Sequence, residues 1–349
     1  MSNKVFKQLP TFARRTYRGG KLLGDFLKLE NAADTNCPED WISSFVEAKN
    51  KDYIPNEGIT RVLTDEGECL ITEAVEPSDF GDGRENSGVL IKLLDAGERL
   101  GIQVHPTKEY AKEHFGMPYG KTECWYILNT RDEDACVYLG FKEYVTKELF
   151  QTLFEKQDIS GMLDAMHCFR VRAGDVILVT AGTPHAIGAG CFLLEIQEPT
   201  DYTMRAEKIT VAGEMLTPQQ IHYGVGEKAM LDCFSYAGGT EEEIRKRHFL
   251  RPNQTKKEIF DLVRYSDTEC FALRKIERGE YSAQEPFFVT VVACEDGGTL
   301  SYGDTTKPLA RGEKYFIGAN TAFTLKNVVA VLCYPPKLPE INLSKENNG

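Results

Sequence analysis

The sequence lacks any long hydrophobic run. No apolar stretch in its 349 residues approaches the roughly 20 residues that a helix needs to cross a bilayer. The longest apolar runs, at residues 287–294 and 328–334, have the length of β-strands. Basic residues near the N-terminus are not followed by an apolar segment, so they do not form an export signal. We therefore expect a cytoplasmic protein that does not bind membranes.

The sequence also lacks a Cys-x-x-Cys motif and a basic tract. Its ten cysteines occur singly, most of them inside apolar strand-like runs, which predicts buried, reduced thiols in a reducing compartment. Acidic residues outnumber basic ones by 53 to 41, so the net charge is −12. Nucleic-acid binding would need a cationic stripe, and none is present, so we expect no nucleic-acid partner. An anionic small substrate would have to be bound by a few local cations.

The sequence does contain many short β-like segments separated by Gly, Asp and Pro turns. The clearest of them span residues 88–94, 101–104, 124–128, 136–141, 176–180, 191–197, 271–276, 287–294 and 328–334. Regularly spaced short strands favour a sandwich or barrel over a doubly wound sheet, so we expect a fold dominated by β-structure. Helical signals are few. Residues 147–154 have one apolar face, and capping-box patterns begin at Thr217 and Thr240.

One segment of the chain recurs near its end. Residues 173–185 align without a gap with residues 311–323, and both copies read as a turn, a strand and a second turn. At the last aligned position the first copy has His185, whereas the second has Phe323. This repeat predicts a duplicated barrel in which only the first copy keeps a metal site.

The repeat also predicts the domain organisation. We expect an N-terminal catalytic domain at residues 1–240 and a C-terminal domain without metal ligands at residues 250–349. The polar, charged stretch at residues 238–257 would connect the two β units.

Three strand-like segments contribute candidate metal ligands. Gln103 and His105 lie two residues apart, and residues two apart on a strand point to the same face. Glu123 lies on the next predicted strand, where Lys121 shares its face. His185 follows the strand of the first repeat copy. These four candidate ligands, with two imidazoles, a carboxylate and an amide oxygen, suit one zinc or another borderline divalent ion.

The spacing of these residues is similar to that of the two cupin motifs, a Gly-x5-[His/Gln]-x-His strand and a Gly-x5-x-x-Gly-x-x-His strand. The chain departs from the commonest cupins by an insertion at residues 106–120, which separates His105 from Glu123. The resemblance implies jelly-roll barrels. The remaining histidines lack partners at such spacing, and we expect surface or structural roles for them.

Longer segments resemble the type I phosphomannose isomerases, particularly their short bacterial form. The segments are QVHP at residues 103–106, KTECWY at 121–126, AGTPHA at 181–186, EIQ at 195–197 and DYTMR at 201–205. The likeness extends over most of the chain. It implies two cupin units and interconversion of mannose 6-phosphate and fructose 6-phosphate through an enediol or enediolate. It also implies Zn²⁺ bound by Gln103, His105, Glu123 and His185.

Aldose–ketose isomerisation needs a general acid/base that reaches both carbons and positive charge near the developing oxyanion. We predict Asp201 as the base-side carboxylate and Glu195 as a second support. Lys121 and Arg205 would be the cationic contacts to a sugar phosphate, and Arg205 matches the active-site arginine of the family. The identity of the base stays open.

Other functions remain open at this point. Residues 206–215 do not reproduce a second basic phosphate clamp, so an isomerase for another sugar or sugar phosphate is one alternative. A non-catalytic metal-binding cupin that senses or binds sugars is another, although it would need no acid/base group beside the metal. A cupin oxygenase is disfavoured by Gln103, because such enzymes usually use histidine-rich ligation. We expect a monomer.

Overall fold

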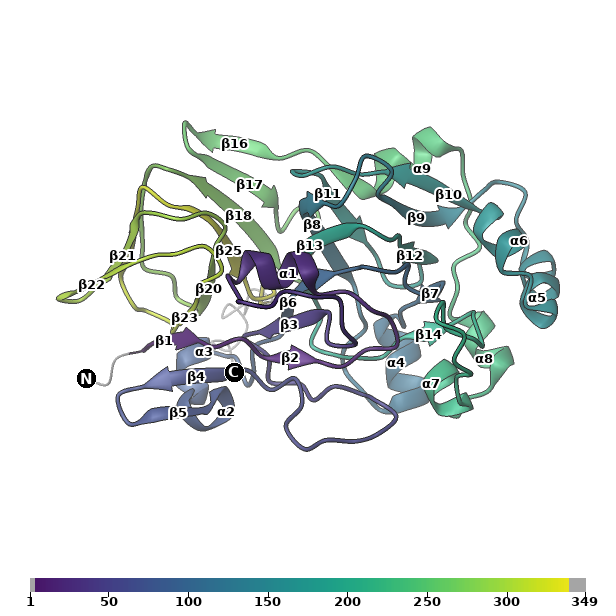
Figure 1. Ribbon diagram of the computed structural model, residues 1–349, viewed down its shortest axis with the longest axis horizontal. Coiled ribbons are helices and arrows are strands. Elements are labelled where there is room, and N and C mark those ends of the chain that lie inside the picture. Colours follow the sequence, from purple (N-terminus) through teal and green to yellow (C-terminus); the bar gives the residue numbers. More distant parts are fainter. Residues whose placement is uncertain (1–3, 339–349) are drawn as a thin grey trace, which may run out of the picture.

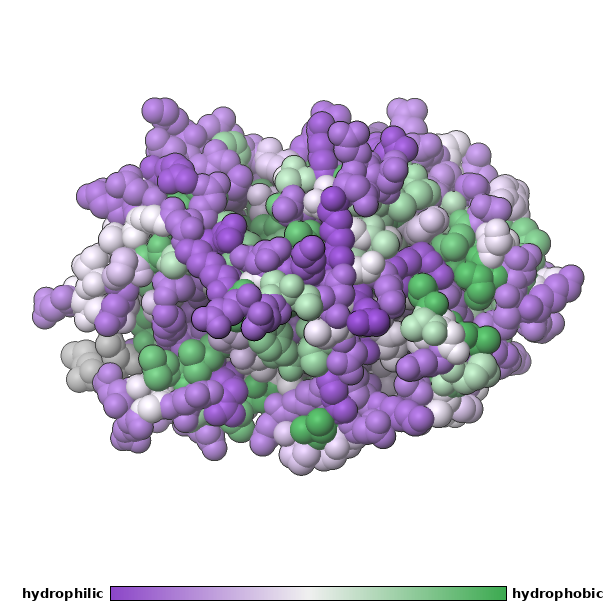
Figure 2. Space-filling model, viewed as in Figure 1, coloured by the Kyte–Doolittle hydropathy of each residue, from purple (hydrophilic) through white to green (hydrophobic). Residues whose placement is uncertain are grey.

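The computed structural model describes residues 4–338 and is built mainly of antiparallel β-strands (Figure 1). The predicted fold, dominated by β-structure with a few short helices, is confirmed. None of the helices between residues 4 and 338 has the length and apolar character that crossing a bilayer requires. On the face drawn in Figure 2, hydrophilic side chains predominate and apolar side chains form small patches.

The first unit consists of two sheets. The order in the seven-stranded sheet is β15 (Phe249–Leu250), β11 (Val176–Val179), β8 (Glu123–Thr130), β13 (Cys191–Gln197), β6 (Leu90–Asp95), β3 (Glu39–Ile42) and β2 (Phe12–Ala13). The order in the five-stranded sheet is β10 (Met166–Arg170), β9 (Cys136–Phe141), β12 (His185–Ile187), β7 (Gln103–Val104) and β14 (Met204–Arg205). The predicted strands at residues 136–141 and 191–197 are confirmed to the residue.

The second unit also consists of two sheets. The nine-stranded sheet runs β16 (Asn253–Lys256), β17 (Ile259–Val263), β18 (Ala272–Glu277), β25 (Val329–Tyr334), β20 (Val289–Ala293), β23 (Lys314–Ile317), β1 (Val5–Gln8), β4 (Arg61–Thr64) and β5 (Gly67–Leu70). The four-stranded sheet runs β19 (Glu280–Ala283), β24 (Phe323–Lys326), β21 (Thr299–Tyr302) and β22 (Thr305–Pro308). Strands from the first 70 residues therefore complete a sheet of the second unit. The division into residues 1–240 and 250–349 remains a proposal, in which β1, β4 and β5 cross from one unit to the other.

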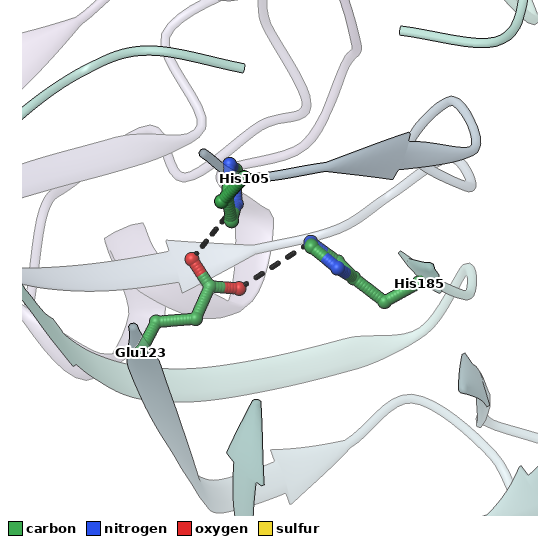
Figure 3. Close-up of side chains that lie close together, drawn as sticks. All are labelled: His105, Glu123 and His185. Carbon is green, nitrogen blue, oxygen red and sulfur yellow. Dashed lines mark ion pairs between the residues drawn. The ribbon is translucent and has the colours of Figure 1, made fainter. Parts of the chain in front are cut away.

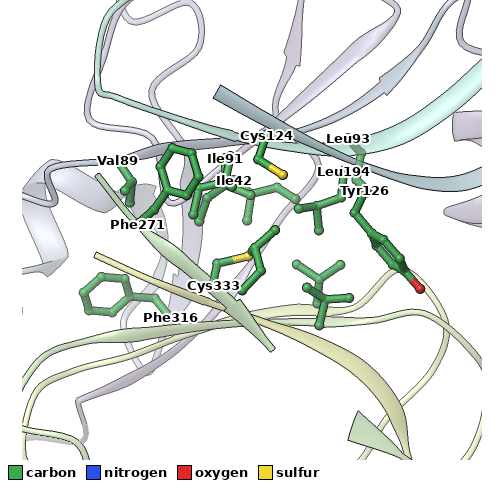
Figure 4. Close-up of a cluster of buried hydrophobic side chains, with 14 of the residues drawn as sticks. Ile42, Val89, Ile91, Leu93, Cys124, Tyr126, Leu194, Phe271, Phe316 and Cys333 are labelled. Atoms are coloured by element: carbon green, nitrogen blue, oxygen red, sulfur yellow. The ribbon is translucent and has the colours of Figure 1, made fainter. Parts of the chain in front are cut away.

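The two units pack back to back through an apolar core, part of which Figure 4 shows. Cys124 and Tyr126 of β8 point into this core, whereas Trp125 and Ile127 point to the opposite face of the seven-stranded sheet and into the core of the first barrel. The alternation follows from the two-residue period of a strand. Because β8, β11, β13 and β6 are covered on both faces, their sequences are nearly continuous apolar runs.

Short helices lie at the ends of the sheets and in the connections. They are α1 (Lys21–Phe26), α2 (Ile71–Ala74), α3 (Pro77–Phe80), α4 (Lys108–Phe115), α5 (Lys147–Lys156), α6 (Ile159–Asp164), α7 (Pro218–His222), α8 (Glu227–Asp232) and α9 (Glu241–His248). Both predicted capping boxes form, with Thr217 capping α7 and Thr240 capping α9. The predicted insertion at residues 106–120 contains α4, whose N-cap is Thr107.

The predicted repeat is visible in the backbone. The glycine of the first turn has a positive φ in both copies, 97° at Gly174 and 86° at Gly312, a conformation that glycine adopts without steric cost. His185 and Phe323 each begin the strand after the second turn, β12 and β24 respectively. The first unit therefore has a histidine at the position where the second has an apolar ring.

Candidate metal centre and active-site pocket

The four predicted metal ligands meet at one end of the first barrel. His185 pairs with Gln103 across strands β12 and β7, and His105 follows β7 directly. Glu123 begins β8 on the opposing sheet. The Nε2 atom of His105 lies 3.0 Å from Oε2 of Glu123, and Nε2 of His185 lies 3.5 Å from Oε1 (Figure 3). The amide nitrogen of Gln103 lies 3.2 Å from Nε2 of His185.

Both imidazoles present Nε2 to the centre of this group. Nδ1 of His105 lies 3.0 Å from the carbonyl oxygen of Tyr202, and Nδ1 of His185 lies 2.8 Å from that of Thr183. A carbonyl oxygen can only accept, so Nδ1 carries the proton and Nε2 keeps its lone pair. Burial and the neighbouring Lys121 ammonium lower the pKa of His105 to about 3, and burial lowers the pKa of His185. Both side chains are therefore neutral near pH 7, the form that binds metals.

The residues present fit a zinc ion. One ligand atom from each of His105, Glu123 and His185 lies within 4.8 Å of the others, and all three side chains are buried. Ligand atoms about 2.0 Å from a tetrahedral zinc would be about 3.3 Å apart, close to the observed 3.0 and 3.5 Å. Oε2 of Glu123 is buried and makes no hydrogen bond of acceptable geometry, although two nitrogen atoms lie near it. The amide of Gln103 can turn its oxygen towards the same point.

Lys121 lies beside these donor atoms. Its ammonium nitrogen is 2.9 Å from Nε2 of His105 and 3.1 Å from Oε2 of Glu123. Burial alone would raise the pKa of Glu123, but nearby groups, first among them the Lys121 ammonium, hold this pKa well below its ordinary value. Trp125 donates to Oε1 of Glu123 at 3.0 Å. The predicted shared face of Lys121 and Glu123 is therefore observed, and the carboxylate is ionised.

A pocket that opens to the surface lies beside this group. It holds about 700 Å³ of space not filled by atoms, including the part that is open to solvent. All four predicted catalytic residues line it, namely Lys121, Glu195, Asp201 and Arg205, together with Gln103. Ile209, Val211 and Leu216 contribute apolar side chains to the lining. The predicted catalytic residues therefore share one cavity with Gln103. The buried His105, Glu123 and His185 lie behind its wall, in contact with Gln103 and Lys121.

Asp201 is held by strong contacts. Its carboxylate accepts two hydrogen bonds from the Arg15 guanidinium, at 3.1 and 3.2 Å, and one from the backbone N–H of Lys49 at 2.8 Å. Burial alone would raise the pKa of Asp201, but Arg15 and Lys92 outweigh it and hold the pKa far below its ordinary value. A carboxylate this weakly basic is poorly suited to accept a proton from carbon near neutral pH. These contacts hold Asp201 as an anion beside Arg15.

Glu195 has a different environment. Its Oε1 atom is buried without a hydrogen bond, and the nearest cation is the Lys92 ammonium at 3.2 Å. Burial raises the pKa of Glu195, although Lys92 opposes the shift. Lys92 also lies 3.6 Å from Glu39, which is paired with Arg15. Glu195 is thus the more basic of the two predicted carboxylates.

Arg205 presents a cation to the pocket without a carboxylate partner within residues 4–338. One terminal nitrogen of its guanidinium donates to the carbonyl oxygens of Thr203 and Gln220. By contrast Arg99, which also lines the pocket, makes a two-bond pair with Glu207. Lys208, in the segment where no second clamp is predicted, pairs with Glu227 and does not line the pocket.

Sequence reasoning missed the charged network in the pocket wall, formed by Arg15, Tyr17, Glu39 and Lys92. One signal could have revealed part of it. Lys92 is the one charged residue within the apolar run at residues 90–94, just as Glu195 is within Cys191–Gln197. A single charge inside a buried strand needs a partner, and these two residues pair across β6 and β13.

Several known proteins that are similar to this chain are named mannose-6-phosphate isomerases. ManA of Bacillus subtilis, a mannose-6-phosphate isomerase, is 41% identical over 232 residues, which cover 64% of this chain and 67% of ManA. The crystal structure of the mannose 6-phosphate isomerase from Bacillus subtilis superposes with a TM-score of 0.73 at 23% identity, covering 95% of this chain and 99% of that one. A zinc-bound mannose 6-phosphate isomerase gives a TM-score of 0.72 at 16% identity, with 96% and 100% coverage. No family model matches the chain. By its similarity to ManA, the chain belongs to the mannose-6-phosphate isomerase family.

Proposed function

We propose that this chain is a zinc-dependent isomerase that interconverts mannose 6-phosphate and fructose 6-phosphate. The observation that carries this proposal is a pocket, in a member of the mannose-6-phosphate isomerase family, lined by four charged side chains and by Gln103. Gln103 and Lys121 of its lining contact the buried His–Glu–His group. Zinc held by Gln103, His105, Glu123 and His185 would supply positive charge beside the oxygen on which negative charge develops. The protein's own side chains would bind the substrate and transfer its protons.

Two cations would bind and orient the substrate. Arg205 has guanidinium nitrogens that are not committed to a carboxylate, and such a group binds phosphate with paired hydrogen bonds. Lys121 places its ammonium beside the ligand group, where it can donate to the sugar oxygens. Together they would bind the sugar phosphate in spite of the protein's negative net charge.

We assign the proton transfer between carbons to Glu195. In the direction from aldose to ketose, its carboxylate would take the proton from C2 and return it to C1, while the hydroxyl proton passes from O2 to O1. Its raised pKa and its Oε1 atom without a hydrogen bond support this role. Asp201, held as an anion, would instead fix Arg15 and the pocket wall.

A coupled isomerase assay across several sugar phosphates, with zinc measured on the same sample, tests the function. We expect about one zinc per chain, turnover of mannose 6-phosphate, and exchange of its C2 proton with solvent. Metal-replete protein that exchanges no proton would show that the proposed substrate is wrong. Turnover of a different sugar phosphate would redirect the proposal to that substrate.

The assignment of the base has its own test. Glu195→Gln should lower kcat by about 10²–10⁴, the usual contribution of a general base, and leave KM near that of the wild type. Loss of kcat in Asp201→Asn with Glu195→Gln unaffected would reverse the two roles.

We further propose that the chain works in the cytoplasm as a monomer. The cysteines in the described part of the chain are all free, in keeping with a reducing compartment. Size-exclusion chromatography with light scattering should give a mass near 39.2 kDa, and a mass twice as large would replace the monomer with a dimer.

A further inference from the structure

Tyr223, which no part of the proposed mechanism uses, is bonded to the chain segment behind the candidate ligand His105. The Tyr223 hydroxyl accepts a hydrogen bond from the backbone N–H of Thr203 at 3.1 Å. It also donates to the carbonyl oxygen of Asp201 at 3.0 Å. One side chain thereby bonds to the peptide groups on both sides of Tyr202.

The peptide group between Tyr202 and Thr203 links this hydroxyl to His105. Its N–H donates to Tyr223, and its C=O accepts from Nδ1 of His105 at 3.0 Å. A trans peptide unit is planar, and its N–H and C=O point in opposite directions. The planar peptide group is therefore a rigid link between the Tyr223 hydroxyl and the His105 imidazole.

The same peptide group also transmits an electronic effect from the Tyr223 hydroxyl to His105. A hydrogen bond from a peptide N–H polarises the unit and makes its carbonyl oxygen a stronger acceptor. A stronger acceptor at Nδ1 makes the imidazole more basic at Nε2 and fixes the plane of the ring. His185 has no comparable distant support, because its Nδ1 donates to Thr183 in the turn directly before it.

Tyr223 is itself well fixed. It occupies the C-cap position of α7 with a φ of 53°, and its ring packs edge-on against Tyr202, with centroids 4.9 Å apart. Tyr202 in turn stacks on Phe115 of α4 at 4.2 Å. Gln220 of the same helix accepts from Arg205, so α7 supports the pocket at two points.

We propose that Tyr223 is a positioning residue for the metal centre, acting on His105 through the peptide that joins Tyr202 to Thr203. The proposal rests on the metal site of the proposed function, but it requires neither the proposed substrate nor turnover. Tyr223 deepens that function by making metal affinity depend on a hydroxyl outside the ligand group.

The test compares two Tyr→Phe variants of the whole chain without sugar. Tyr223→Phe removes the hydroxyl that bonds to Asp201 and Thr203, and it keeps the aromatic ring and its packing. Tyr236→Phe is the matched control, because its hydroxyl also donates to a single carbonyl, that of Leu231, in the same helical region. Zinc affinity is measured by competition with a chelator, and the visible spectrum of Co²⁺-loaded protein reports the ligand geometry.

We expect Tyr223→Phe to weaken zinc binding by about tenfold and to change the Co²⁺ spectrum, because lost outer partners of a ligand typically cost 10–100-fold in metal affinity. Tyr236→Phe should leave both unchanged. Thermal unfolding of the zinc-free variants separates loss of fold from loss of positioning. A Tyr223→Phe affinity within about threefold of the wild type would overturn the proposal, as would an equal loss in Tyr236→Phe. A protein that binds zinc in this pattern but does not turn over mannose 6-phosphate would refute only the proposed substrate.

Discussion

The two units share the turn geometry of the repeated segment but differ in the side chains that surround it. In the first unit Gly182 donates to the carbonyl oxygen of His105 at 2.8 Å, and in the second Asn320 donates to that of Glu285 at 2.7 Å. Gly182 and Asn320 occupy the same position of the repeat, and both have positive φ. The second barrel thus retains the turn that positions a ligand in the first.

Strand pairing extends the comparison to the other ligands. Glu123 pairs with Val179, and Val289 pairs with Ile317, the residue that aligns with Val179. His185 pairs with Gln103, and Phe323 pairs with Ala283. The positions of the four candidate ligands are therefore taken in the second unit by Ala283, Glu285, Val289 and Phe323. The comparison indicates that the repeated turn and its strand pairings form without metal-ligating side chains, so the ligand residues distinguish the first unit from the second.

The largest expected effect comes from the histidine that distinguishes the repeats. His185→Ala should lose both zinc and activity, the latter by a factor of at least about 10³, because a metal supplies several kcal/mol of transition-state stabilisation. Phe323→Ala, its matched control, should keep zinc and lower the free energy of unfolding by about 3–5 kcal/mol. Zinc analysis, the isomerase assay and urea unfolding distinguish the two. Retained zinc in His185→Ala would remove this residue from the site.

A second change transfers a carboxylate to the barrel without a metal. Val289 is 1% exposed within an apolar core, so Val289→Glu buries a charge without a partner and should cost at least about 3 kcal/mol of unfolding free energy. Val289→Ala should cost less, because it only leaves a cavity. Denaturant unfolding measures both. Equal stability of Val289→Glu and the wild type would mean that the second barrel accepts a carboxylate as readily as the first.

A third prediction concerns the charges buried in the first unit. Burial alone would raise the pKa of Glu39, but Arg15 and Lys92 outweigh it and lower the pKa from 4.5 to about 2. The unfolded chain therefore takes up this proton first, so the stabilisation is fully present above about pH 4.5 and is lost as the pH falls towards 2. The contribution of Glu39 to the free energy of unfolding amounts to about 3 kcal/mol.

Unfolding free energies measured at pH 7 and pH 3 should differ less in Glu39→Gln than in the wild type. Glu280→Gln is the control, because this second-unit carboxylate pairs with Lys326 on the surface, where ion pairs contribute little. A wild-type pH dependence in Glu39→Gln would mean that Glu39 is not the titrating group.

The smallest expected effects come from substituting the two turn glycines, Gly174 and Gly312, and the two losses of stability should differ. Gly174→Ala puts an alanine at positive φ with no atom within 4 Å of its Cβ, so it should cost about 1 kcal/mol. Gly312→Ala meets the same strain and places Cβ 2.9 Å from a Leu27 side-chain carbon and 3.1 Å from the Phe26 carbonyl oxygen. Gly312→Ala should therefore lower the free energy of unfolding by more than Gly174→Ala does. Thermal unfolding of both variants checks the order, and a larger loss in Gly174→Ala would contradict it.

Local patterns allowed much of this structure to be predicted. The strand at residues 191–197 and the capping boxes at Thr217 and Thr240 depend on neighbours in the sequence, and they form as predicted. The meeting of Gln103, His105, Glu123 and His185 was predicted from the similarity of their spacing to the cupin motifs, and they do lie together. The partner of Asp201 could not be predicted in this way. Arg15 lies 186 residues away in the sequence, and it reaches Asp201 only after β2, β3 and β6 have paired.

The pairing of β1 with β23 has a consequence for synthesis of the chain. Val5 is among the earliest described residues to leave the ribosome, yet its partner Ile317 is translated more than 300 residues later. At about 5–20 residues per second, the nascent N-terminal strand waits at least ~15 seconds for that neighbour. During this interval the unpaired edge of β1 is a natural target for chaperones.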